Sequence, residues 1–125
     1  MCAIGEIMLS EKFAEIFGGA PSLLARAPGR VNLLGEHVDY NEGVVLPAAI
    51  DREVSLAAAP VKDRCVTLHA LDLDQQASFS LDALESHQDQ DGGTLPQWAQ
   101  YPAGVAWALQ EAGYAVQGMQ ALYTS

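Results

Sequence analysis

Three segments in the middle of the chain alternate apolar and polar residues, which is the period of a β-strand. They run from Arg52 to Ala59, from Cys65 to Leu71 and from Ala77 to Leu81, with polar turns between them. Val44 to Ile50 is a further candidate strand, and Pro47 inside it indicates a sheet edge or a bend. Strands that follow one another through turns predict an antiparallel meander.

A first helix is predicted near the start of the chain. Ser10 can cap it and Gly18-Gly19 can end it, and three apolar residues between them would share one face: Phe13, Ile16 and Phe17. Pro21 then breaks the chain. Ser22 to Ala27 follows as a short predicted strand that ends at Pro28-Gly29.

A second helix is predicted after Pro96, a residue suited to a first helical turn, and Gly113 would end it. Five apolar or aromatic residues of this helix recur at helical spacing: Trp98, Tyr101, Val105, Leu109 and Ala112. Pro102 should kink this helix or force a restart. Residues 86–94 form a predicted polar loop, and Gln117 to Thr124 alternates as a last strand.

Strands and helices together place the chain in the α+β class, and we expect a mixed, mainly antiparallel sheet with helices on one side. The sequence ends at Ser125, directly after a predicted strand. We therefore expect these 125 residues to be part of a larger fold.

The charge of the chain excludes some classes of partner. Six Lys and Arg face sixteen Asp and Glu, a net charge of -10, whereas nucleic acids and acidic membranes need basic patches. The two cysteines, Cys2 and Cys65, form no metal or redox motif, which fits a reduced compartment. No signal peptide or membrane-spanning segment is evident. We expect a cytoplasmic protein that binds neither nucleic acid nor membrane.

The segment from Ala27 to Gly43, APGRVNLLGEHVDYNEG, is dense in polar groups although apolar strands flank it. Seven of these groups fall within twelve positions: Arg30, Asn32, Glu36, His37, Asp39, Tyr40 and Asn41. Glycines at 29, 35 and 43 allow turns that a side chain would forbid. This pattern predicts a loop that folds its side chains inward around a small polar ligand.

The residue types in this segment suit a sugar. Carboxylates accept hydrogen bonds from hydroxyl groups, and Glu36 and Asp39 are three apart, so one helical turn would place them on a common side. His37 can donate or accept, and Arg30 offers a fork of donors for phosphate oxygens or a carboxylate. The ordinary alternative is a set of solvated loop residues, with Arg30 in a salt bridge to Asp39 or Asp51.

A metal site is a further alternative. Its candidate ligands are His37, Asp39, His69 and Asp72, but their spacing matches no standard zinc pattern. We predict no metal site from protein ligands in this chain, and we expect His69 and His87 to be a strand residue and a loop residue.

Residues Arg30 to Tyr40, RVNLLGEHVDY, resemble the galactokinase sugar-binding signature, GRxNLxGEHxDY. Further on, Leu95 to Tyr101 followed by Gly104-Val105 is similar to the WANYxxGV helix of that family. The resemblance extends along almost the whole chain, with the sugar-binding motif at 26–43 and the poorest match at 86–94. The galactokinases belong to the superfamily of galactose, homoserine, mevalonate and phosphomevalonate kinases.

The resemblance implies phosphoryl transfer from ATP, with Mg²⁺, to the anomeric hydroxyl of D-galactose. Glu36, His37 and Asp39 match the family's sugar-hydroxyl binders. Arg30 matches the arginine beside the reaction centre, which steadies the transferring phosphoryl group and keeps the catalytic aspartate ionised. Trp98 matches a position near the adenine pocket. An interpretation that fits this residue at least as well is a core aromatic residue on an amphipathic helix.

The same resemblance implies parts that these 125 residues do not contain. The family's phosphate loop, a Gly-Leu-Ser-Ser-Ser-Ala run, is absent, and so are the catalytic aspartate and the second domain. We therefore expect residues 1–125 to be part of the amino-terminal domain of a two-domain sugar kinase, monomeric at full length and inactive alone. Kinases of N-acetylgalactosamine or L-arabinose, and a non-catalytic galactose sensor on the same fold, stay as alternatives.

Overall fold

Helices and strands both contribute to the computed structural model, which describes residues 2–35, 37–38 and 41–125. In chain order the elements are α1 (Cys2–Phe17), β1 (Leu23–Leu34), β2 (Leu46–Pro60), β3 (Cys65–Ala70), η2 (Leu71–Leu73), β4 (Gln75–Ser80), η3 (Leu84–Ser86), α2 (Gln97–Glu111) and β5 (Met119–Thr124). The α+β class is confirmed. Among the described residues no helix is long and apolar enough to cross a membrane.

The five strands of the described residues form one sheet in the order β1-β2-β5-β3-β4. Every neighbouring pair is antiparallel except β3 with β5, which is parallel, so the expectation of a mixed, mainly antiparallel sheet is confirmed. The predicted meander is wrong in one place, because β5 lies between β2 and β3. Ala121 and Leu122, neighbours on β5, are both fully buried, and a strand that is apolar on both faces is stabilised at the centre of a sheet.

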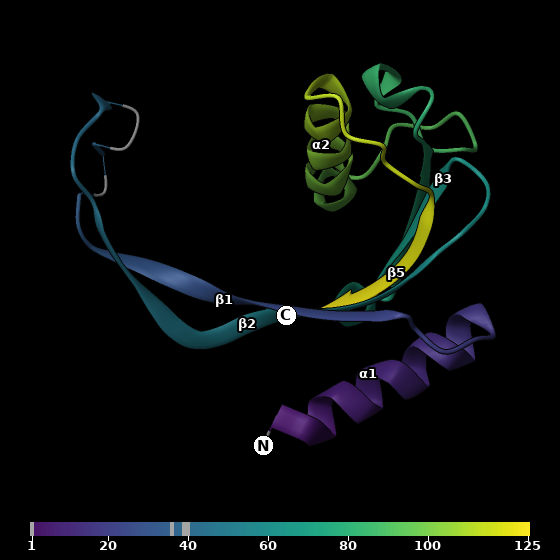
Figure 1. Cartoon of the computed structure of the whole chain (residues 1–125), viewed down its shortest axis with the longest axis horizontal. Coiled ribbons are helices and arrows are strands. Elements are labelled where there is room, and N and C mark those ends of the chain that lie inside the picture. The colour runs from purple at the N-terminus through teal and green to yellow at the C-terminus, as the bar shows by residue number, and fades with distance from the viewer. Residues whose placement is uncertain (1, 36, 39–40) are drawn as a thin grey trace.

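The two helices lie on opposite faces of the sheet (Figure 1). On one face, Leu9 and Phe13 of α1 pack with Ala57 and Leu122. On the other, the buried side of α2 packs with a larger core that includes Leu68, Phe79 and Ala121. The expectation that the helices share one side is therefore wrong. Successive residues of a strand point to opposite faces of the sheet. Residues 57 and 58 of β2 and residues 121 and 122 of β5 are all apolar and buried, so each of these strands has an apolar residue to bury on either face.

Small residues form the buried side of α2. Ala99, Ala103 and Ala106 are buried, whereas Tyr101 is 77% exposed and Val105 is 62% exposed, although both of these larger residues recur at helical spacing. Alanines at i, i+4 and i+7 let a helix approach its neighbours closely, which larger side chains would prevent. The helix continues through Pro102 without a restart, and Gly113 follows its end with φ +84°, as predicted.

Helix α1 is longer than the sequence predicts, because it begins at Cys2 and not at Ser10. The hydroxyl of Ser10 donates a hydrogen bond of 2.8 Å to the carbonyl oxygen of Glu6, one turn earlier. Ser10 is therefore inside the helix, in a bond that serine also makes there. The predicted stop is confirmed, since Gly18 has φ +78°.

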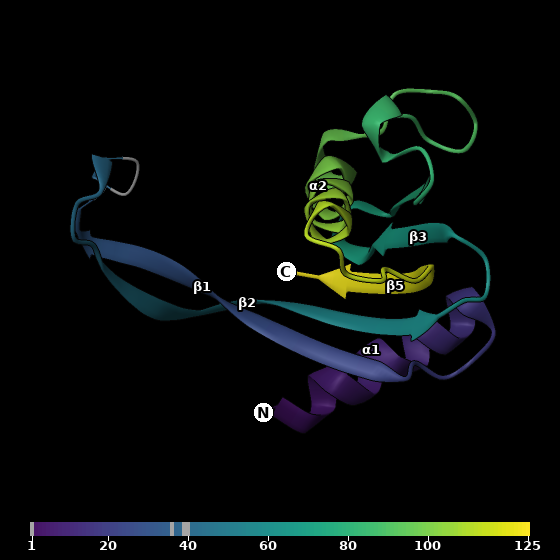
Figure 2. The same cartoon turned by 45° about the horizontal axis from the view of Figure 1, so that its top comes forward.

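Strands β1 and β2 extend far beyond the other three strands as a two-stranded arm (Figures 1 and 2). The arm comprises residues 28–34 of β1 and 46–53 of β2, which pair with each other and with no other strand. Its register shifts between Pro28 and Arg30, where the sequence predicts the end of a strand. A Cβ on Gly29 would lie 3.1 Å from Ile50 and 3.2 Å from the carbonyl oxygen of Arg52, so glycine suits this irregularity.

Candidate functional site

The described residues of the polar segment identified in the sequence run along β1 of the arm and continue to its distal end (Figures 1 and 2). Its first residues do not form the predicted loop, because Arg30 to Leu34 continue strand β1. Arg30 lies opposite Ala49, and Asn32 lies opposite Pro47 on β2. Strand geometry sends successive side chains to opposite faces, so Arg30 and Asn32 share one face of the arm.

Backbone hydrogen bonds close the turn at the end of the arm. The carbonyl oxygen of Val38 accepts one from the N–H of Gly43, at 2.7 Å, and another from the N–H of Asn41, at 3.0 Å. The side-chain amide of Asn41 donates to the carbonyl oxygen of His37 at 3.2 Å. These bonds fix the backbone around His37 and Val38, and with it the direction in which their side chains leave the chain.

Two glycines of this segment stand where a side chain would not fit. Gly35 has φ +91°, and a Cβ on it would lie 2.9 Å from the carbonyl oxygen of Val44. A Cβ on Gly43 would lie 2.5 Å from the Cβ of Val38. The sequence predicted turns at both positions, and the structure adds the reason, since the two sides of the loop approach closely here.

Arg30 and His37 are the two predicted site residues of the arm that the structure describes, and both are exposed to solvent. Among the described residues Arg30 forms no ion pair, so the alternative of a salt bridge to Asp51 is not realised. Its guanidinium therefore stays available to a bound anion or carboxylate. Glu36, Asp39 and Tyr40 lie outside the described residues, and their convergence around a ligand stays a prediction.

The metal alternative gains no support from the arrangement of the described side chains. No three of the His, Cys, Asp and Glu residues that the structure describes gather closely enough to hold a cation. His69 is on β3 and Asp72 is on η2, both in the body of the molecule, whereas His37 is at the end of the arm.

Trp98, the predicted adenine neighbour, lies on α2 in the body of the molecule and not on the arm. Its indole N–H donates a hydrogen bond of 2.8 Å to the side-chain oxygen of Gln75. Its ring meets Tyr123 edge-on, with centroids 5.9 Å apart, and burial raises the pKa of the Tyr123 phenol. These contacts are those of an aromatic residue at the margin of a core. Sequence analysis missed Gln75, because a lone glutamine at a strand end gives no local signal.

Comparison with known proteins identifies the segment on the arm. A family model described as the galactokinase galactose-binding signature matches residues 11–60. These residues include β1, the end of the arm and β2. A curated galactokinase from Roseiflexus is 43% identical over 117 residues, which is 94% of this chain. This chain is therefore similar to galactokinases over almost its whole length.

Solved structures agree with this similarity. A Lactococcus lactis galactokinase complexed with galactose superposes on 95% of the chain with a TM-score of 0.76 and 34% identity. A Methanococcus jannaschii mevalonate kinase matches 86% of the chain with a TM-score of 0.60 and 16% identity, a likeness of fold. The chain spans 28% of the Roseiflexus protein and 30% of the Lactococcus protein.

Proposed function

We propose that this chain contributes the sugar-binding segment of a kinase that transfers a phosphoryl group from ATP to the anomeric hydroxyl of D-galactose. One observation carries the proposal: the sequence RVNLLGEHVDY stands within the galactose-binding signature matched over residues 11–60. The relative whose structure holds galactose has the same fold over 95% of this chain. The relatives are about three times as long as this chain. The proposed activity and substrate are therefore those of a whole protein of that length, to which this chain contributes.

In the proposed site the sugar is recognised by groups at the distal end of the arm. Glu36 and Asp39 would accept hydrogen bonds from its hydroxyl groups, and His37 would donate or accept one. Sites that hydrogen-bond a hydroxyl reject analogues that lack it, because the protein groups are then left unpaired. The exposed guanidinium of Arg30 would steady the negative charge of the transferring phosphoryl group and keep a catalytic carboxylate ionised.

ATP with Mg²⁺ supplies the phosphoryl group and neutralises its charge when bound. Among the described residues, Trp98 would be the one that contacts the nucleotide. The indole N–H of Trp98 is already bonded to Gln75, so Trp98 would offer an adenine its ring surface and not a donor. No described cluster fits Mg²⁺, so we propose no step of the reaction that depends on a metal held by this chain alone.

The 125 residues alone are expected to give no turnover. They contain no Gly-Leu-Ser-Ser-Ser-Ala run and no residue that matches the family's catalytic aspartate. A coupled ATP and galactose assay of the purified chain tests this expectation, and turnover above a control without the chain would contradict it. We propose that the protein lies in the cytoplasm, in keeping with its two cysteines, which form no metal or redox motif.

Sugar binding can be tested without turnover. D-galactose is titrated into the ¹⁵N-labelled chain, and the amide signals of His37 and Asn41 are followed, with D-glucose, the epimer at C4, as the control sugar. We expect galactose to shift these signals and glucose to shift them much less. Asp39→Asn should weaken galactose binding at least tenfold, whereas Asp91→Asn, in a loop of the body, should leave it unchanged.

The outcomes separate the proposal from its alternatives. Equal shifts with both sugars, or equal binding by Asp39→Asn and the unmodified chain, would contradict sugar recognition by this segment. If N-acetylgalactosamine or L-arabinose bound more tightly than galactose, that sugar would become the proposed substrate, and the proposed site would stay the same.

A further inference from the structure

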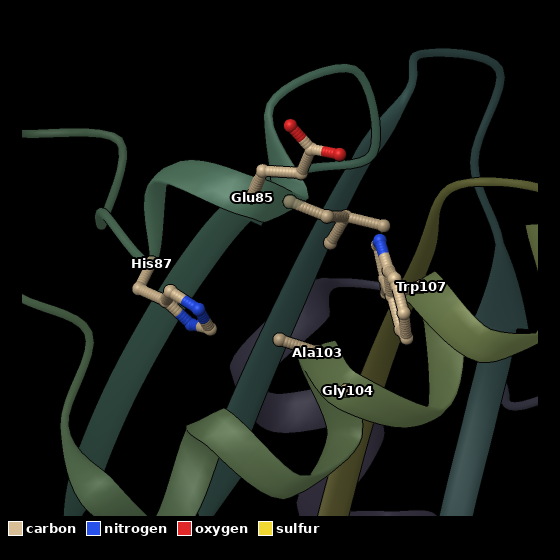
Figure 3. Close-up of a pocket in the computed structure, with 6 residues that line it drawn as sticks. Glu85, His87, Ala103, Gly104 and Trp107 are labelled. Carbon is tan, nitrogen blue, oxygen red and sulfur yellow. The ribbon is translucent and has the colours of Figure 1, made fainter.

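A cavity lies between η3 and α2, on the body of the molecule and away from the arm (Figure 3). Its volume is about 320 Å³, at the lower end of the range for small-molecule sites. Six residues line it: Leu84, Glu85, His87, Ala103, Gly104 and Trp107. Arg30, His37 and Trp98 are not among them, so the cavity is separate from every site residue considered above.

The cavity has two aromatic walls. The imidazole of His87 and the indole of Trp107 stand on opposite sides of it, with Ala103 and Gly104 of α2 at its base (Figure 3). Trp107 keeps 46% of its surface exposed, a large fraction for tryptophan, which is highly buried on average in folded proteins. A flat ring placed between these two walls would meet a π-face on each side.

The backbone fixes the His87 wall. His87 has φ +51°, an uncommon conformation for a residue with a side chain. Its carbonyl oxygen accepts a hydrogen bond of 2.9 Å from the N–H of Leu95, and its own N–H donates to Leu84 at 3.4 Å. These two bonds hold the loop against the start of α2, so the cavity does not depend on a free loop.

Charge selects the kind of ligand. Glu85 stands at the rim of the cavity, and among the described residues its carboxylate has no ion-pair or hydrogen-bond partner. The whole chain carries a net charge of -10, which attracts cations and repels anions. Indole faces also attract cations. The cavity therefore disfavours phosphates and carboxylates, and it favours a positive group.

We propose that this cavity binds a small, flat organic cation, such as an aryl amidine or an aromatic amine. The ring lies between His87 and Trp107, and its cationic substituent faces Glu85. This site is additional to the sugar-binding function and independent of it.

Three probes of one shape test the proposal: benzamidine, benzamide and benzoate, with charges of +1, 0 and -1. Each is titrated into the ¹⁵N-labelled 125-residue chain, and the indole N–H of Trp107 and the amide of Gly104 are followed. Trp98→Phe assigns the two indole signals. We expect affinity in the order benzamidine, benzamide, benzoate, with about threefold to fivefold between the first two, the usual effect of one exposed ion pair.

Variants locate the binding. A Cβ on Gly104 would meet nothing within 4 Å, so Gly104→Leu can fill the cavity without a backbone clash and should abolish binding of all three probes. Glu85→Gln should lower benzamidine affinity to that of benzamide. Asp91→Asn removes a charge from an exposed position of the following loop that does not line the cavity, and should change affinity less than twofold.

Several results would overturn the proposal. They are absence of binding by all three probes, equal affinity for benzamidine and benzoate, and unchanged binding in Gly104→Leu. The helical circular dichroism of Gly104→Leu is measured in parallel. If that variant is unfolded, Trp107→Ala takes its place, since loss of one ring wall should weaken benzamidine by at least fivefold, and unchanged affinity in it also overturns the proposal.

Discussion

The guanidinium of Arg26 on β1 holds the carboxylate of Glu53 on β2, with Nε 3.2 Å and Nη2 2.7 Å from the same oxygen, Oε2. Its Nη1 atom lies 3.6 Å from the carboxylate of Glu6 on α1. Arg26 therefore joins three elements at the point where the arm leaves the sheet, next to the register shift after Pro28.

Arg26→Met keeps the apolar stem and removes the charge, and it should lower the free energy of unfolding by about 0.5–1 kcal/mol. The loss is small because these side chains are more than a third exposed, where ion pairs are screened by water. Urea denaturation at 0.05 M and 1 M NaCl measures it, and the difference should shrink at high salt. Lys62→Met, in an exposed turn, is the control. A loss that is independent of salt would mean that Arg26 acts through packing.

Gly118 precedes β5 and is buried. A Cβ on it would overlap the carbonyl oxygen of Asp63, and it would lie 2.6 Å from that of Cys65. Because backbone atoms cannot move aside cheaply, Gly118→Ala should destabilise the fold by about 3 kcal/mol. Gly104→Ala, in the middle of α2 with nothing within 4 Å, should instead stabilise it by up to about 1 kcal/mol. Thermal unfolding of the two variants compares them, and equal melting temperatures would contradict the assigned crowding.

Gly35 connects the structure of the arm to the proposed function. Gly35→Ala should weaken D-galactose binding at least tenfold, because φ +91° strains any other residue and the new Cβ would approach the carbonyl oxygen of Val44. The body should stay folded, which the buried Leu122 amide reports through hydrogen exchange. Gly93→Ala, at an open position, is the matched control. Normal galactose binding by Gly35→Ala would show that the shape of this turn does not matter for recognition.

Asp72 gives the end of β5 a dependence on pH. The pKa of Asp72 is lowered, first by the hydrogen bond from the N–H of Ser125, at 2.7 Å, and then by that from the hydroxyl of Thr124, at 2.8 Å. A lowered pKa in the folded state means that the carboxylate stabilises the fold above the ordinary range of aspartate, about 4. The contribution is lost as the pH falls below that range.

Hydrogen exchange at Thr124 and Ser125, followed from pH 6 to pH 2.5 and corrected for intrinsic rates, tests this effect. Protection should fall as Asp72 becomes protonated, and Asp72→Asn should have weak protection at every pH. Asp74→Asn is the control, since Asp74 has a backbone φ of +49° that asparagine also adopts. Protection that is independent of pH in the unmodified chain would contradict the assignment.

Much of the local structure could be predicted from the sequence. The alternating segments at 52–59, 65–71 and 77–81 each contain most of a strand, because a half-buried strand leaves a period of two in its residues. Gly18 and Gly113 were correctly predicted as helix ends, since both have the positive φ that glycine adopts without strain.

Helix faces were harder to predict. Tyr101, Val105 and Leu109 of α2 recur at helical spacing in the sequence, yet these residues are exposed and the alanines at 99, 103 and 106 are buried. The choice depends on how closely the helix approaches the sheet, and this distance is a property of the packed molecule. The arm was missed for a similar reason, because a bulge at Gly29 lets one strand continue where local signals predict a stop.

The signature between Arg30 and Tyr40, the α+β class and most element positions can be predicted from residue types alone, because each depends on a short stretch of chain. Three features are visible only in the folded molecule: β5 enters between β2 and β3, α1 and α2 cover opposite faces, and the strand that begins the signature extends into a long arm. Those features depend on which distant residues exclude water together, and a local period specifies that a face is apolar without specifying its partner.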